Sequence, residues 1–271
     1  MDYRQIEETA EWLKAHTAYR PQVAIILGSG TGELADCITD RDVFPYGEIP
    51  NYPVSTVPGH KGQLIFGRLN GVPVMAMQGR FHYYEGYTMQ QVTLPERVMK
   101  LLGIKTLLMT NAAGGMNPKF TPGDLMIVTD HINNFPEHPL RGRNDDRFGT
   151  RFPDMGEVYT HRLIDIAEKV AAAQGIALKR GIYIGSSGPT FETPAEYRLF
   201  HLWGADATGM SSVPEAIVAH HSGLEVFTLS VITNCPDSEV VKEVTHEEVQ
   251  EVAATVQSRL TALFSGMMPL I

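Results

Sequence analysis

The sequence of 271 residues contains only two cysteines, Cys37 and Cys235, and they form neither a CxxC pair nor a zinc-binding pattern. The lack of a disulfide framework favours a reducing compartment. Long hydrophobic runs are also missing, since no window approaches the ~18–20 apolar residues that cross a membrane. The first residues, "MDYRQIEETAEWLKAH", are typical of an amphipathic helix and not of a signal peptide. We therefore expect a cytoplasmic protein without membrane contacts.

Positive charge is scarce as well, because 22 Lys and Arg stand against 31 Asp and Glu, giving a net charge of −9. Proteins that bind nucleic-acid backbones or anionic membranes do so through many lysines and arginines. The charge balance therefore argues against nucleic acid as a partner. A small anionic substrate is compatible with it if a few cations gather in one pocket.

No Ser/Gly linker, charge block or internal repeat divides the chain, so we expect residues 1–271 to form a single domain. Short apolar runs rich in β-forming residues predict strands that are covered on both faces. Together with the turns that end them, they lie at 23–32, 72–80, 106–115, 125–131, 181–192 and 225–234. Asn70-Gly71 is a strong hairpin signal, so part of the sheet is expected to be antiparallel.

Helix-like stretches alternate with these runs, at 88–102, 157–175, 194–203, 214–222 and 245–264. Thr245 and Glu248 predict a capping box for the last of them. The alternation predicts an α/β fold with a central mixed β-sheet flanked by helices. The aperiodic segment 133–155 predicts a long functional loop. Ligands of such sheets bind beyond the carboxyl ends of the strands, so the polar residues that follow the apolar runs should converge there.

The stretch "QGRFHYYEGY" (78–87) places Arg80 and His82 directly after an apolar run. Arginine offers a fixed donor fork for phosphate oxygens, and histidine donates as an imidazolium or, when neutral, through one nitrogen. "GSGTG" (28–32), with the Ser29 hydroxyl, and "NAAGG" (111–115) are glycine-rich exits from two other runs, where backbone N–H groups can surround an anion. "GSGTG" matches neither a dinucleotide fingerprint nor a P-loop, and either motif is alternatively a plain turn.

A second group of motifs suits a ring-shaped ligand. "SSGPTFETPAE" (186–196) places Phe191 and Glu192 between a strand and a helix. Glu192 either decorates the helix start, where the dipole favours a carboxylate, or accepts ring N–H groups while Phe191 covers a ring face. "ATGMSSVPE" (207–215) offers Met210 and Ser211, although methionine is usually core filler. "SVITN" (230–234) ends in two polar residues, which are alternatively part of an ordinary turn.

Rival chemistries lack their motifs. "HEEVQ" (246–250) has no second histidine of an HExxH motif, and no other histidine pair has metal spacing, so no metal is expected. No GxSxG elbow indicates a serine hydrolase. The residues alone therefore indicate an α/β enzyme, or a binding protein, for a small molecule that carries phosphate.

In order, the motifs resemble those of the trimeric purine nucleoside phosphorylases over nearly the whole chain: "LGSG", "VPGH", "GRFHYYEGY", "TNAAGG", "HPLRGRNDDRFGTRFPDM", "GPTFETPAE", "GMSSVPE", "ITN" and "THEEV". The resemblance implies a nucleoside phosphorylase-like fold. It also implies phosphate-dependent cleavage of purine (2′-deoxy)ribonucleosides to the free base and (deoxy)ribose 1-phosphate. Inorganic phosphate would be a co-substrate, no cofactor would be needed, and the assembly would be a homotrimer.

The family's site residues map onto this sequence by function. The phosphate site maps onto Ser29, Arg80, His82, the backbone N–H of Ala112, and Ser211; the sugar contacts onto Tyr84, Met210 and His246; and the base contacts onto Phe191, Glu192, Thr233 and Asn234. Phe148 in "DRFG" matches a phenylalanine that a neighbouring subunit adds to the sugar pocket. The resemblance gives the catalytic roles to His82, Glu192 and Asn234.

The amide of Asn234 can accept from N7–H of a purine and donate to O6, whereas a 6-amino group would suit an aspartate better. Asn234 therefore indicates 6-oxopurines such as inosine and guanosine, with Glu192 accepting from N1–H. Xanthosine is an alternative substrate, because Thr208 stands where relatives often carry an apolar residue and 235–244 differs from vertebrate-like members.

Three other activities fit the motifs less well. A 5′-methylthioadenosine phosphorylase would favour a carboxylate in place of Asn234, and His246 suits a 5′-hydroxyl instead. A non-catalytic nucleoside-binding protein would have little use for Ser29, Arg80 and His82 beneath the sugar. A nucleoside hydrolase would need a metal-binding aspartate cluster, which the sequence lacks.

Overall fold

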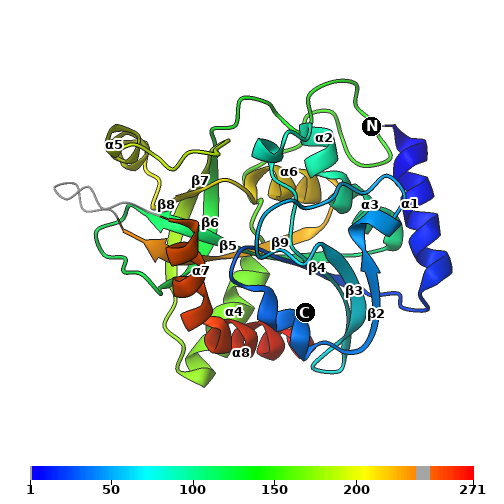
Figure 1. Cartoon of the computed structure of the whole chain (residues 1–271), viewed down its shortest axis with the longest axis horizontal. Coiled ribbons are helices and arrows are strands. Elements are labelled where there is room, and N and C mark those ends of the chain that lie inside the picture. Colours follow the sequence, from blue (N-terminus) through cyan, green and yellow to red (C-terminus); the bar gives the residue numbers. More distant parts are fainter. Residues whose placement is uncertain (1, 236–244) are drawn as a thin grey trace.

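A single mixed sheet runs through the computed structural model, which describes residues 2–235 and 245–271 (Figure 1). Within these residues the strands are β1 (Val23–Leu27), β2 (Thr39–Pro45), β3 (Gln63–Leu69), β4 (Val72–Gln78), β5 (Thr106–Gly115), β6 (Leu125–Asn133), β7 (Lys179–Gly185), β8 (Ala207–Gly209) and β9 (Glu225–Asn234). Their order is β2-β3-β4-β1-β5-β8-β7-β6-β9. Because β9 also pairs with β5, the strands from β5 to β9 close into a circuit.

The strand pattern of the sequence accounts for most of this sheet. β1, "VAIIL", is buried at every position and lies between β4 and β5, parallel to both. The predicted hairpin is confirmed: β3 and β4 are antiparallel, and Asn70 and Gly71 at their turn have φ of 48° and 80°, the left-handed values that a tight hairpin requires. β2 was not predicted, because "TDRDVFP" is mostly exposed and contains no apolar run.

The helices are α1 (Tyr3–His16), α2 (Met89–Val92), α3 (Leu94–Leu102), α4 (His161–Gln174), α5 (Pro194–Leu202), α6 (Val213–His221), α7 (His246–Thr255) and α8 (Gln257–Met267). The stretch 88–102 forms two helices, because Pro95 has no N–H to give to the carbonyl of Gln91 and a new helix begins at Leu94. The stretch 245–264 is divided at Val256, whose φ of −107° and ψ of 0° are not helical. Thr245 caps α7 with Oγ1 accepting from the Glu248 N–H at 3.2 Å, which is one of the two hydrogen bonds of the predicted capping box.

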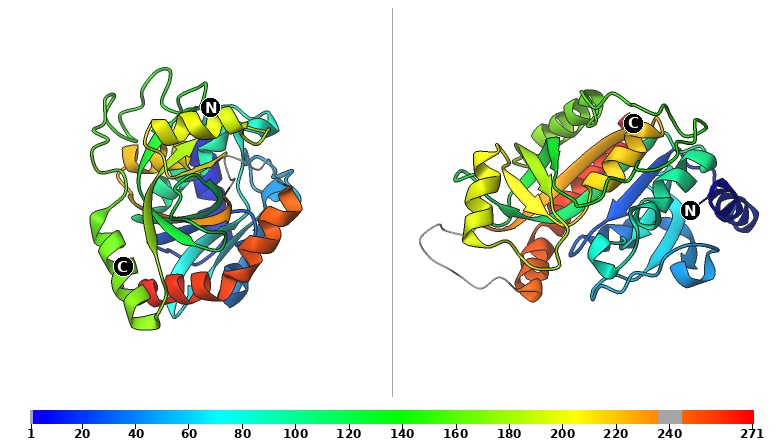
Figure 2. Two further views of the ribbon diagram at one scale, coloured as in Figure 1. Left: turned by 90° about the vertical axis from the view of Figure 1, so that its left-hand side faces the viewer. Right: turned by 90° about the horizontal axis from the view of Figure 1, so that it is seen from above.

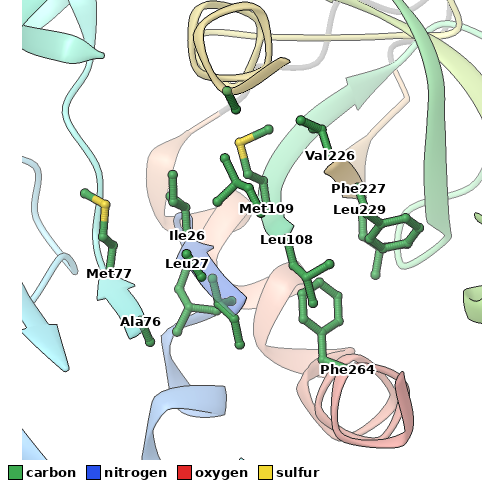
Figure 3. Packing of buried hydrophobic residues seen from close by; sticks show 14 of the residues in the cluster. Ile26, Leu27, Ala76, Met77, Leu108, Met109, Val226, Phe227, Leu229 and Phe264 are labelled. Carbon is green, nitrogen blue, oxygen red and sulfur yellow. The ribbon is translucent and has the colours of Figure 1, made fainter. Parts of the chain in front are cut away.

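Helices cover both faces of the sheet. α4 and α8 pack on one side of β9 and β5, and α6, with α3 beside it, on the other (Figure 1). In the close view of the core, Phe264 of α8 points at the sheet, and its ring lies 6.2 Å from that of Phe227 in β9 (Figure 3). Figure 2 shows α1 and α5 at opposite ends of the molecule. In the described part of the chain, no helix combines the length and the apolar character that crossing a bilayer requires.

The sheet topology brings the predicted polar residues to one edge. β1, β4, β5 and β9 are linked by parallel pairing, so their carboxyl ends lie together. β8 runs antiparallel to β5, and its last residue, Gly209, is close to the carbonyl of Ala112. The chain after β8 therefore continues toward the same edge. Residues 134–160, between β6 and α4, contain neither helix nor strand, in agreement with the loop predicted at 133–155.

Candidate active site

A cavity of about 570 Å³ opens at this edge of the sheet. Twelve of the predicted site residues line it: Ser29, Arg80, His82, Tyr84, Ala112, Phe191, Glu192, Met210, Ser211, Thr233, Asn234 and His246. They come from seven separate motifs that span more than 200 positions of the sequence. The predicted convergence of the strand ends is therefore observed, and Phe148 is the predicted residue that lies elsewhere.

Arg80 is held rigidly at one end of the cavity. Its side chain is only 2% exposed, and Nε lies 3.1 Å from Glu215 Oε1. Nη1 donates to the carbonyl of Thr110 at 2.9 Å and to Ser211 Oγ at 3.0 Å. Ser211 thus accepts from Arg80 and keeps its own proton for another acceptor. Gly28 lets the guanidinium approach, because a Cβ there would lie 3.3 Å from Nη1.

His82 is tied to Glu85, which lies in the same stretch, "QGRFHYYEGY". His82 Nδ1 lies 2.9 Å from Glu85 Oε1, and the other carboxylate oxygen accepts from the N–H and hydroxyl of Thr56, both at 2.7 Å. Burial would raise the pKa of Glu85, but the hydrogen bonds from His82 and Thr56 outweigh it and lower the pKa to about 2. Burial lowers the pKa of His82. A neutral His82 with Nδ1–H on the carboxylate presents Nε2 to the cavity as an acceptor.

Ser29 is joined to the histidine of the "VPGH" motif (57–60), a residue without an assigned role in the sequence analysis. His60, in the segment before β3, places Nε2 3.3 Å from Ser29 Oγ and Nδ1 3.0 Å from Ser55 Oγ. Burial, and then the positive charges that His82 and Arg80 can carry, lower the pKa of His60 to about 3. The ring is therefore a neutral hydrogen-bonding support for Ser29. Only the motif "VPGH" hinted at it, and no local pattern shows that this loop folds against β1.

"NAAGG" (111–115) is not the turn that the sequence suggested. These residues continue β5 and pair with β9, and the last two also pair with β8. β1 pairs with β5 only as far as Met109, so the edge of β5 at Ala112 is not paired with β1. The small side chains let other groups approach the strand closely. A Cβ on Gly114, for example, would lie only 2.8 Å from the Tyr197 hydroxyl.

Glu192 lies at another part of the cavity, between β7 and α5. Its Oε1 accepts from Thr208 Oγ1 at 2.8 Å and from Ser186 Oγ at 3.1 Å. The departure noted at Thr208 is therefore part of the site, where its hydroxyl fixes one oxygen of the carboxylate. The Tyr197 hydroxyl also lies within hydrogen-bonding reach of the Glu192 carboxylate. Phe191, beside Glu192, is partly exposed at the cavity.

Asn234 ends β9 with its amide oriented by two neighbours. Thr233 Oγ1 donates to Asn234 Oδ1 at 3.1 Å, and Asn234 Nδ2 donates to the hydroxyl of Tyr197 at 3.3 Å. Tyr197 was not predicted, because nothing in its local sequence marks it as a site residue. Of the stretch 235–244 that departs from the family pattern, residues 236–244 lie outside the described residues.

The residues matched to the sugar contacts also line the cavity. The ring of Tyr84 stacks on that of His82 with centroids 4.7 Å apart, and burial raises the pKa of Tyr84 to about 12. His246 Nε2 lies 2.9 Å from the Gln250 amide nitrogen and 3.4 Å from the Pro58 carbonyl oxygen. Among the described residues, no group of three or more His, Cys, Asp or Glu is arranged to hold a metal ion.

Phe148 is buried within its own chain. It is 5% exposed, and its ring lies 5.9 Å from that of Tyr3 in α1. In this arrangement it presents almost no surface to a neighbouring subunit. The exposed aromatic residue of the same loop is Phe152, which is 86% exposed. "DRFG" and "TRFP" are equivalent in local pattern, so the sequence alone did not show which phenylalanine faces outward.

Known proteins match this chain over nearly its whole length. The family described as the Phosphorylase superfamily matches residues 22–268. The chain is 50% identical over 274 residues to the purine nucleoside phosphorylase of Rattus norvegicus, covering 98% of this chain and 94% of that protein. It is 51% identical over 258 residues to purine nucleoside phosphorylase 1 of Geobacillus stearothermophilus, covering 95% and 94%. The crystal structure of Schistosoma mansoni purine nucleoside phosphorylase in complex with inosine has a TM-score of 0.95 and 40% identity, covering 100% of this chain and 97% of that chain.

Proposed function

Because the chain belongs to the phosphorylase superfamily and, within it, to the purine nucleoside phosphorylases, we propose that it cleaves 6-oxopurine (2′-deoxy)ribonucleosides with inorganic phosphate. The products are the free base and (deoxy)ribose 1-phosphate. Inosine and guanosine are the proposed substrates. The reaction places the enzyme in purine salvage.

The observation that carries this proposal is the distance between two polar groups along β5. Arg80 contacts β5 at Thr110, whereas Asn234 and Tyr197 meet it at Gly114, four residues further on. At ~3.3 Å per residue, four residues of an extended strand span roughly 13 Å. That length accommodates a phosphate, a sugar and a purine in line. The anion-binding and ring-binding ends of one cavity are thus spaced for a nucleoside with phosphate beneath it.

At the phosphate end, the proposed donors are Arg80, the hydroxyls of Ser29 and Ser211, and the N–H of Ala112. Glu215 already balances the charge of Arg80, so directed hydrogen bonds supply much of the recognition. His82 Nε2 is an acceptor when the ring is neutral, and it suits the P–OH proton of hydrogen phosphate. This arrangement favours a protonated phosphate dianion over the fully ionised form.

At the base end, Glu192 accepts from N1–H through the oxygen that Thr208 and Ser186 leave free. Asn234 Oδ1 accepts from N7–H as the base departs. Cleavage develops positive charge on the sugar and negative charge on the purine, so phosphate beneath the anomeric carbon stabilises the first and Asn234 the second. Tyr84, Met210 and His246 hold the sugar in line between the two groups. Positioning and electrostatics carry the reaction in this proposal, with phosphate as co-substrate and without metal or cofactor.

We further propose a cytoplasmic homotrimer in which a loop of one subunit reaches the sugar pocket of the next. The sequence assigned Phe148 to that contact, but its burial beside Tyr3 favours a structural role. Phe152 is the better candidate, because 86% of this apolar residue is exposed and would be covered by a neighbour. The free thiols of Cys37 and Cys235 are compatible with a reducing compartment.

The function is tested by measuring free base released from inosine, guanosine, xanthosine and adenosine, each with and without inorganic phosphate. Phosphate-dependent release of hypoxanthine and guanine, with little adenine, is the expected result. Release of free base at the same rate with and without phosphate would contradict the proposal and indicate a hydrolase. Binding without release in either condition would indicate a nucleoside-binding protein. Xanthine release would extend the substrate range to a 2-oxo base.

A further inference from the structure

The hydroxyl of Tyr197 is a polar group of the cavity to which the family motifs give no role. Tyr197 lies in the first turn of α5, which Thr193 caps and Pro194 begins. Capping fixes the direction in which the helix starts, and this direction aims the ring back over β5. The hydroxyl lines the same cavity as Asn234 and Glu192 and accepts from Asn234 Nδ2 at 3.3 Å.

The lack of a side chain at Gly114 leaves space for the Tyr197 hydroxyl. A Cβ on Gly114 would lie 2.8 Å from Tyr197 Oη and 3.3 Å from Asn234 Nδ2. A contact under 3 Å is shorter than a carbon and an oxygen tolerate, so an alanine at this position would displace the tyrosine. Gly114, Asn234 and Tyr197 therefore form one compact group at the end of the cavity away from Arg80.

The protons of this group can be counted. Burial and then the negative charge of Glu192 raise the pKa of Tyr197, so the phenol keeps its proton. The Asn234 amide nitrogen has two hydrogens, and one of them is given to Tyr197 Oη. Tyr197, having accepted, still has its own proton, and the Glu192 carboxylate lies within reach as its acceptor. Once N1–H of a base occupies that carboxylate, one O–H donor of Tyr197 and one N–H donor of Asn234 lie side by side, next to the place where Asn234 meets the base.

Building on the proposed function, we propose that Tyr197 determines specificity at position 6 of the purine by donating a hydrogen bond to the 6-oxo oxygen. The second hydrogen of Asn234 Nδ2 reaches the same oxygen. When the C–N bond breaks, its electron pair passes to the purine and part of the charge spreads onto O6. The bond from Tyr197 therefore strengthens in the transition state. A 6-amino group is itself a donor and would meet two donors.

The test compares the variant Tyr197→Phe with the wild type on two nucleosides. Inosine carries the 6-oxo group, and unsubstituted purine riboside carries only hydrogen at that position. The kcat/KM for inosine should fall roughly tenfold, the value of one hydrogen bond, while that for purine riboside stays within about twofold. Calorimetry with hypoxanthine and unsubstituted purine should give the same selective loss. Tyr19→Phe is the matched control, since it removes a phenol bonded to the Asp40 carbonyl outside the cavity.

An equal loss with both nucleosides would mean that Tyr197 acts by packing alone, and the proposal would be wrong. An unchanged rate with inosine would overturn it as well. If Tyr197→Phe unfolds at lower temperature, Tyr197→Leu must show the same selective loss. Failure of the wild type to release base from inosine with phosphate would instead refute the proposed function itself, which separates the two hypotheses.

Discussion

Arg80 and Glu215 form an ion pair in which neither side chain is more than 3% exposed, with Nε 3.1 Å from Oε1. The pair joins the segment that follows β4 to α6, and the two lie far apart in the sequence. Glu96 lies nearby, and burial, with the charge of Glu215 as second cause, raises its pKa well above the usual value. Burial therefore disfavours a second negative charge at Glu96, and Glu215 is the carboxylate that pairs with Arg80.

We expect Glu215→Gln to lower the free energy of unfolding by roughly 3 kcal/mol or more, because a buried cation is left without its counterion. Chemical denaturation measures the loss. Phosphate should restore part of it, since the anion supplies the missing charge beside Arg80. The control is Glu225→Gln, which breaks the exposed pair with Arg162 and should cost no more than about 1 kcal/mol. A Glu215→Gln variant that gains no more stability than the wild type from phosphate would contradict the phosphate site.

The depressed pKa of His60, about 3, predicts how stability depends on pH. Between pH ~6.5, the usual pKa of an unfolded histidine, and pH 3, the unfolded chain binds a proton at this position that the folded chain does not. The contribution of His60 to stability is therefore complete above pH ~6.5 and declines as the pH falls toward 3. His60→Gln should flatten this part of the profile in unfolding experiments from pH 7 to 3. His201→Gln, an exposed histidine on α5, is the control, and an unchanged slope in His60→Gln would refute the assignment.

Alanine variants of Phe148 and Phe152 should have different effects. One should change the stability of the fold, and the other should change a sugar pocket shared between subunits. Phe148→Ala removes a buried ring and should cost about 3 kcal/mol of unfolding free energy, whereas Phe152→Ala should cost less than about 0.5 kcal/mol. If Phe152 completes a neighbour's sugar pocket, its alanine variant should raise the KM for inosine several-fold while the KM for phosphate changes little. Steady-state kinetics and thermal unfolding of both variants check this. A normal inosine KM in Phe152→Ala would remove Phe152 from the site.

Asn234→Asp should raise the kcat/KM for adenosine relative to inosine by at least about tenfold, because a carboxylate accepts from both N7–H and a 6-amino group. The amide nitrogen that donates to O6 and to Tyr197 is lost at the same time. Competition assays with both nucleosides in one mixture give the ratio directly. If the ratio stays as in the wild type, Asn234 does not read position 6.

The sequence predicted which residues belong to the site more accurately than it predicted their local structure. Twelve of the named residues line one cavity, because motifs that follow apolar runs are carried to one edge by parallel pairing. The sequence was wrong about "NAAGG", which continues β5, because glycine-rich residues are as typical of turns as of strands that other groups approach closely. It also missed the break at Pro95, although a proline inside a helical pattern often begins a new helix.

By itself, the sequence determined the α/β alternation, the hairpin at Asn70-Gly71 and the set of residues with phosphate and base chemistry, because periodicity and turn preferences are local properties. Tertiary structure alone decided that Glu215 neutralises Arg80, that Thr208 and Ser186 hold one oxygen of Glu192, and that Tyr197 meets Asn234 over Gly114. It also decided which phenylalanine of the long loop is exposed. These relationships join residues from different elements, and a contact between elements depends on how the whole sheet is paired, which no local pattern encodes.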